Sequence, residues 1–240
     1  MCTMYAITQT IVLFHILFFF ILGTFKILPE HRANCITLFS SMTEEMDKDE
    51  TGEVNVIGRW VNTSSASGSC LFEAPNATAI GSWFHNWFTM VTNHITPVID
   101  DNMARKIILK KEPSWKAKYD KVGHEAPKGY SLYTIHFECD FAHRAAGNAA
   151  LSAMTEEQDK TDSGDVINMG RYHNLANGTG FCICAAKSAY DLQAWAYNWN
   201  STSNCTIEPV MSDTEIRGMV KSKPNYAMDL VKAKAATGRA

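Results

Sequence analysis

The chain has 240 residues, which is enough for one large domain or two small ones. Hydrophobic residues make up 46% of it and charged residues 20%, a composition typical of a globular protein rather than a disordered or fibrous one. Asp and Glu number 25 against 22 Lys and Arg, and no long basic run occurs, which argues against a nucleic-acid-binding protein. Seven cysteines, none in a CxxC pair, indicate neither a zinc ribbon nor a dense disulfide framework.

The N-terminal 25 residues contain no Asp, Glu, Lys or Arg, and Ile11–Leu22 is apolar except for His15. An apolar run of this length fits the core of a signal peptide, whereas the wider stretch 4–25 fits a marginal membrane anchor. We therefore expect residues 1–22 to direct the chain to the secretory pathway or to a membrane. The alternative is a cytoplasmic protein in which this segment extends an apolar strand, because positive charge and a clear cleavage site are both missing.

The most informative feature of the sequence is an internal repeat. Residues 31–105 align without a gap on residues 143–217, at an offset of 112, and 27 of the 75 aligned positions are identical. Such similarity indicates a tandem duplication. It predicts a first unit at 19–118, a linker at 119–130, a second unit at 131–230 and a tail at 231–240.

The second unit has the clearer pattern of elements. Ser131–Cys139 alternates apolar and polar residues, as a half-buried strand does, and the offset places the matching first strand of unit one at Phe19–Ile27. The Ala-rich stretch from His143 to about Lys160 predicts one helix. The order is βαββαβ, the split βαβ arrangement of ferredoxin-like folds. The remaining elements are strands at Val166–His173, Phe181–Ala186 and Cys205–Met211, and a helix at Ala189–Asn200.

A sheet with helices on one face must bury its other face. Two such units in one chain can bury these faces against each other, as the two copies of a homodimer do. We therefore predict an α+β fold in which two ferredoxin-like units form a pseudo-dimeric α+β barrel within a monomer.

The repeated residues form a set of motifs that resembles a known family, domain of unknown function 3303. Its members are similar to dimeric α+β barrel, ferredoxin-like proteins, so the resemblance implies this fold for both units. It implies no reaction and no catalytic residues. The wider class of such barrels includes monooxygenases, polyketide cyclases, haem-degrading enzymes and binding proteins, which leaves the function open. The motif residues, each repeated 112 positions later, are Gly58, Arg59, Gly68, Cys70, Trp83, Asn86, Trp87, Ile95, Pro97, Val98, Asp101 and Arg105.

Arg59 and Arg171 occupy equivalent strand positions after a glycine. A guanidinium that reaches into a cleft can hold a carboxylate or a phosphate through two hydrogen bonds. The alternative is an ion pair that joins the strand to a helix, for which Asp101 and Asp213, or the carboxylates of the repeated MTEE motif at 42–45 and 154–157, are suitable partners.

Two tryptophans lie four residues apart in each predicted second helix and so share one helix face. They are Trp83 and Trp87 in the first unit and Trp195 and Trp199 in the second. An aromatic wall of this kind can stack a flat organic ligand. The alternative is that the indole rings belong to the core and cover the sheet.

His136 and His173 have no histidine at the matching positions of the first unit. They are candidates for acid–base or ligand-contacting groups specific to the second unit, on strands that we expect to be adjacent. No histidine or cysteine spacing indicates a metal site. The sequence also lacks GxGxxG, P-loop, HExxH and GxSxG motifs, so no cofactor is indicated.

Together these features predict a protein that binds a small organic ligand in a cleft between sheet and helices, with no catalysis established. The alternative is a structural or protein-interaction scaffold, tethered to a membrane if residues 4–25 form an anchor.

Overall fold

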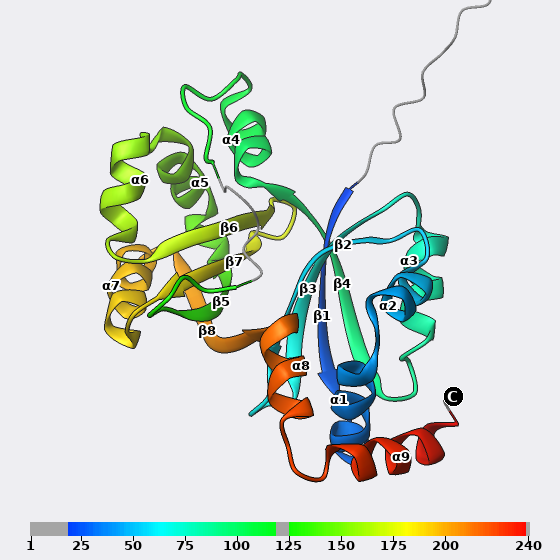
Figure 1. Cartoon of the computed structure of the whole chain (residues 1–240). Coiled ribbons are helices and arrows are strands. Elements are labelled where there is room, and N and C mark those ends of the chain that lie inside the picture. The colour runs from blue at the N-terminus through cyan, green and yellow to red at the C-terminus, as the bar shows by residue number, and fades with distance from the viewer. Residues whose placement is uncertain (1–18, 119–124, 239–240) are drawn as a thin grey trace, which may run out of the picture.

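The computed structural model describes residues 19–118 and 125–238, and in it the two halves of the chain repeat one arrangement (Figure 1). In each half four strands form an antiparallel sheet, and helices cover its outer face. The first half contains β1 (Phe19–Ile27), α1 (Arg32–Ser41), α2 (Glu44–Thr51), β2 (Asn55–Asn62), β3 (Ser67–Ala74), α3 (Ala77–His85), β4 (Val91–Asp100) and α4 (Asp101–Leu109), with a 3-10 turn at Pro29–His31.

The second half repeats these elements and adds a helix at its end. It contains β5 (Ser131–Cys139), α5 (Arg144–Ala153), α6 (Glu156–Ser163), β6 (Ile167–Asn174), β7 (Thr179–Ala186), α7 (Ala189–Trp199), β8 (Ser203–Ser212), α8 (Asp213–Lys221) and α9 (Tyr226–Thr237), with a 3-10 turn at Phe141–His143.

The two sheets join edge to edge and close into one barrel, in the order β1-β3-β2-β8-β5-β7-β6-β4. Both junctions are short antiparallel pairings. At one junction Trp60 of β2 faces Ser212 of β8, and at the other Asp100 of β4 faces Tyr172 of β6. The prediction of a pseudo-dimeric α+β barrel is therefore confirmed.

Side chains from both halves fill the inside of the barrel. Trp60 and Phe181 are fully buried there, with ring centroids 5.6 Å apart, and Leu71 and Ile183 are buried beside them. Each half thus covers the inner sheet face of the other, which removes a large apolar area from water.

The last helix of each repeated unit crosses to the other half. Figure 1 shows α4 beside α5 and α8 beside α1. This exchange follows from the barrel closure, because α4 and α8 begin directly after β4 and β8, the strands that pair with the other half. The first residue of each exchanged helix, Asp101 or Asp213, therefore lies at a junction between the halves.

The single helix predicted from His143 to about Lys160 is wrong, because two helices occupy this stretch. Met154 has an extended conformation and ends the first of them. Thr155 caps the start of α6 with a capping box, in which its hydroxyl accepts a hydrogen bond from the backbone N–H of Gln158. The first half breaks at the equivalent place, where Thr43 accepts from the Met46 amide.

The first strand begins within the apolar N-terminal segment. Phe19–Ile27 forms β1, as the repeat predicts, and pairs with β3 and β4 along its length. Residues 19–25 of the expected anchor 4–25 are therefore strand residues, and the rest of the segment lies outside the described residues. No helix in the described part of the chain is long and apolar enough to cross a membrane.

We predict that Gly180→Ala destabilises the fold by about 1–3 kcal/mol. A Cβ atom at Gly180 would overlap the ring of Phe137 and lie 2.5 Å from the carbonyl oxygen of Tyr172, which belongs to the paired strand and cannot move freely. Gly81→Ala is the matched control, because a Cβ in this exposed position of α3 meets nothing within 4 Å. We expect the control to stabilise by about 0.5–1 kcal/mol, since alanine favours helix. Urea unfolding measures both changes, and equal effects would contradict the packing argument.

Candidate functional site

Arg171 lies in an ion-pair network and does not point freely into a cleft. Its Nε donates to Asp101 Oδ1 at 2.8 Å, and its Nη2 donates to Asp159 Oδ1 at 2.9 Å. Asp159 belongs to the same half, whereas Asp101 is the first residue of α4 from the other half. The arginine thus joins a strand to two helices, as the ion-pair interpretation predicts.

The pseudo-symmetric network in the first half is built in the same way. Arg59 Nε donates to Asp213 Oδ2 at 2.9 Å, and Arg59 Nη1 donates to Asp47 Oδ1 at 2.8 Å. Asp213 begins α8, the helix that comes from the second half. The two halves are therefore held together by a reciprocal pair of arginine–aspartate contacts.

Each exchanged helix also carries an arginine of its own, which binds the end of a helix in the other half. The last carbonyl groups of a helix have no partner within that helix, so a cation placed there is favourable. Arg217 Nη1 donates to the carbonyls of Phe39 and Met42 at 2.7 Å each, and Arg105 Nη1 donates to those of Leu151 and Met154.

Asp101 and Arg105 are fully buried charged groups of these networks. The side chain of Asp101 is 0% exposed and contacts Arg105, Arg171 and His173. Burial alone would raise the pKa of this carboxyl, but Arg171 and the hydrogen bond from His173 hold it well below its usual range. In contrast, burial raises the pKa of Asp213, although Arg59 and Arg217 oppose the shift. The two junctions are therefore alike in sequence but different in electrostatics.

His173 and His136 lie on opposite faces of the sheet. His173 Nε2 is 3.0 Å from Asp101 Oδ1 on the outer face, and His136 Nε2 is 3.1 Å from Ser69 Oγ on the barrel side. The expectation that they occupy adjacent strands is wrong, because β7 lies between β5 and β6. In β7 their facing residues are consecutive, Phe181 for His136 and Gly180 for His173, so the two imidazoles point apart.

The tryptophans of the second half are held by one carboxylate. Trp195 Nε1 and Trp199 Nε1 both donate to Asp162 Oδ2, at 3.0 and 2.8 Å. In the first half Trp87 Nε1 donates to Glu50 Oε2 at 2.7 Å, and Trp83 packs edge to face against Phe72. Trp83 and Trp195 are buried in the core, and Trp87 and Trp199 are half-buried and pack against it.

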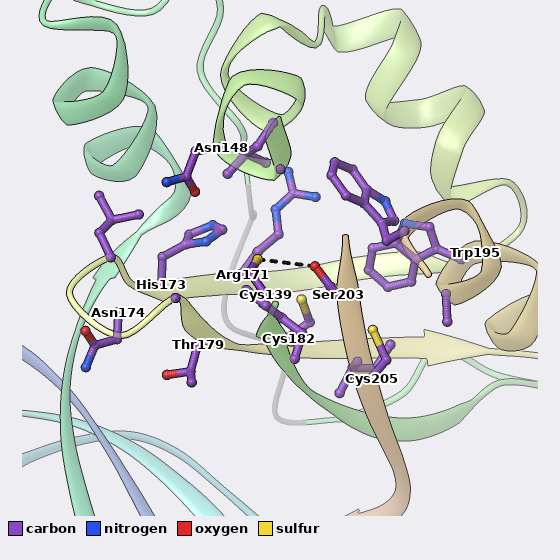
Figure 2. A pocket seen from close by; sticks show the side chains of 18 residues that line it. Cys139, Asn148, Arg171, His173, Asn174, Thr179, Cys182, Trp195, Ser203 and Cys205 are labelled. Carbon is purple, nitrogen blue, oxygen red and sulfur yellow. Dashed lines mark hydrogen bonds between the residues drawn. The ribbon is translucent and has the colours of Figure 1, made fainter. Parts of the chain in front are cut away.

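A pocket lies between the outer face of the second sheet and helices α5 and α7. It encloses about 750 Å³, including the solvent space at its mouth. Arg171 and His173 line it from β6, and both tryptophans of α7 line it from the opposite side (Figure 2). Four of the residues predicted for ligand contact therefore surround one cavity, whereas His136 lies inside the barrel.

The first half contains the equivalent pocket, of about 730 Å³, which is lined by Arg59, Trp83 and Trp87. The two pockets differ in polarity. Where the first has Ile36 and Val61, the second has Asn148 and His173. The same change occurs at two further places, where Cys139 and Ser203 replace Ile27 and Val91. At one place the order is reversed, because the first pocket has Asn93 where the second has Cys205.

Sequence reasoning did not single out Asn148 or Ser203. A comparison of the two repeats position by position contains the signal that identifies them, because both are polar where the first unit is aliphatic. What the sequence alone does not show is that these two positions face the same cavity as Arg171, since they lie on α5 and β8.

Three thiols line the second pocket, those of Cys139, Cys182 and Cys205 (Figure 2). All three are free cysteines. Burial raises the pKa of Cys182 and of Cys205, so these groups are protonated near neutral pH. They therefore act as small, weakly polar parts of the wall.

We predict that the stability of the protein falls as the pH drops below about 6.5, the pKa of an unfolded histidine. Burial lowers the pKa of His173 although Asp101 opposes the shift, and burial lowers that of His136 in the same direction. The unfolded chain then binds more protons than the folded one at acid pH, so stability is complete above this range and is lost below it.

The His173→Val variant, which introduces the residue of the first unit, removes one of these contributions. We expect the slope of unfolding free energy between pH 5 and 6.5 to decrease by up to about 1.4 kcal/mol per pH unit. Urea unfolding at a series of pH values measures the slope. His136→Thr is the companion variant: it removes the other contribution, so the slope should decrease there too, while the contribution of His173 stays in place. An unchanged slope in His173→Val would contradict the assignment.

Solved structures with the same fold support this architecture. A chlorite dismutase mutant from Candidatus Nitrospira defluvii, in complex with cyanide, has a TM-score of 0.50 and 11% identity, with 84% of this chain and 94% of that chain covered. A DypB variant in complex with manganese also has a TM-score of 0.50, at 9% identity, with 83% and 95% covered. A Rhodococcus jostii RHA1 DypB variant in complex with heme has a TM-score of 0.48 and 8% identity, with 83% and 95% covered. At these identities the first two show the fold alone.

No curated protein sequence matches this chain. The two halves nevertheless match one family separately, over residues 18–112 and 131–224, which together make up most of the chain. These are the segments that the repeat and the barrel identify as equivalent. The chain therefore belongs to the family described as Domain of unknown function (DUF3303), with one copy of the domain in each half.

Proposed function

We propose that this protein binds a small organic ligand in the pocket of the second half. The observation that carries the proposal is the cavity itself, where an apolar wall and a few polar side chains converge between sheet and helices. Ligand pockets in proteins have this character, with mostly apolar walls and a few polar groups that fix the orientation of the ligand. Catalysis is not part of the proposal.

The second half is favoured over the first by the polar groups that it alone carries. Asn148, His173 and Ser203 can orient a ligand by hydrogen bonds, whereas Ile36, Val61 and Val91 at the same positions cannot. The first pocket, which is aliphatic at these three positions, is equally well explained as imperfect packing under the helices. The unit-two pocket (the cavity lined by Arg171, His173, Trp195 and Trp199) is therefore the proposed site.

Heme and manganese, which are bound by the similar DypB structures, do not fit the residues of this pocket. Its one histidine, His173, has a side chain that is 6% exposed and bonded to Asp101, so it is not free to reach a heme iron. In the described part of the chain no three His, Cys, Asp or Glu side chains are grouped as a metal site. We derive no step through either group.

A structural or protein-interaction scaffold is the second candidate function. The filled barrel favours it, because buried side chains occupy the interior in place of a ligand. They include Trp60, Leu71, Phe181 and Ile183. In this alternative the outer pockets have no occupant. A binding experiment on the unit-two pocket separates the two candidates.

We predict that fragments from a library of mixed charge bind the full-length protein in one shared site and raise its melting temperature. Ala196→Phe introduces the residue of the first unit, Phe84, and places a ring in the unit-two pocket. We expect it to weaken fragment binding by about tenfold or more. Ligand-observed NMR and thermal shift measure the effect.

Tyr197→Ala is the control, because Tyr197 lies on the same helix with 72% of its surface exposed. Its binding should equal that of the wild type. If no fragment binds, or if fragments bind Ala196→Phe as well as the wild type, the proposed function is wrong and the scaffold is favoured.

A further inference from the structure

We infer that the unit-two pocket takes an uncharged, planar ring compound; this inference rests on the proposed function. Three observations carry it: the pairing of the charged group at the pocket wall, the orientation of the two indole rings, and the small number of polar side chains that remain.

The cation at the pocket wall is already neutralised by the protein. Arg171 Nη2 donates to Asp101 Oδ2 at 3.1 Å and to Asp159 Oδ1 at 2.9 Å, while its Nε donates to Asp101 Oδ1. Its side chain is 6% exposed, and the Asp101 side chain is 0% exposed. An anionic ligand would have to displace these carboxylates, so Arg171 contributes its aliphatic stem to the wall and not a binding charge.

The two indole rings present carbon surface to the pocket. Both N–H groups donate to Asp162, which does not line the cavity. This shared carboxylate fixes the orientation of Trp195 and Trp199 relative to each other. Rigid aromatic surfaces favour flat partners, because a pair of stacked rings is stabilised beyond the burial of its area.

The remaining polar side chains of the wall carry no charge. Asn148, Thr179 and Ser203 provide amide and hydroxyl groups. Asp101 only accepts hydrogen bonds, so His173 donates to it through Nε2–H, and burial lowers the pKa of His173, which favours the neutral ring. A charged ligand would therefore lose its hydration without gaining a counter-ion, which is costly, whereas an uncharged ring gains apolar contact.

The test uses three compounds that share the naphthalene ring and differ in the charge of one small substituent: naphthalene-methanol, naphthoate and naphthylmethylammonium. Calorimetric titration of the full-length protein measures their affinities. We expect the neutral alcohol to bind at least about tenfold more tightly than either ion. Ala196→Phe should abolish this binding, and Tyr197→Ala should retain it.

A second variant that fills the pocket keeps the test valid if Ala196→Phe does not fold. Leu151→Phe introduces the first-unit residue Phe39 at another position of the wall, and the melting temperature of each variant reports its fold. If naphthoate or the ammonium compound binds as tightly as the alcohol at this site, the inference is wrong and the proposed function stands. If charged fragments bind the site but none of the naphthalenes does, the inference is again wrong. If nothing binds there, the proposed function fails as well.

Discussion

The structure depends most on the contacts of one buried carboxylate, that of Asp101. It begins a helix of the first half, yet it contacts Arg171 and His173 of the second, and its side chain is 0% exposed. A buried charge with no partner is strongly unfavourable, so the carboxylate and both of its arginine partners require the barrel to be closed. The same contact occupies the guanidinium of Arg171 and the Nε2 of His173, and this determines what the neighbouring pocket can bind.

The duplication explains how a pocket could diverge without loss of the fold. Both halves retain the crossed arginine–aspartate contacts and the tryptophan pair over the sheet. The first half packs aliphatic residues and Phe84 around its cavity, while the second has polar residues and Ala196 at the same positions. The same framework thus occurs twice in one chain, and the two copies differ in the residues that line their outer pockets.

The fold was predictable because the repeat reveals its own symmetry: one βαββαβ unit with an uncovered sheet face implies a second unit to cover it. The break at Met154–Thr155 was missed because the Ala-rich stretch has a continuous helical composition. The capping box at Thr155, where the next helix begins, was not recognised within it. The exchange of α4 and α8 follows from strand pairing at the junctions, which local patterns do not encode. For Arg59 and Arg171 the sequence left ligand contact and an ion pair open, and both arginines form ion pairs in the structure. The pairing of His173 with Asp101 joins residues 72 positions apart, which a local pattern does not reveal.

The most direct test compares Asp101→Asn with Asp213→Asn by urea unfolding at neutral pH. The account predicts that Asp101→Asn destabilises by on the order of 3 kcal/mol or more, because it removes the carboxylate that two enclosed arginines share and leaves Asp159 as the single described carboxylate near both. Asp213→Asn should cost clearly less, since its side chain is 26% exposed and water can solvate Arg59 in part. Equal losses, or a larger loss at Asp213, would contradict the central role of Asp101.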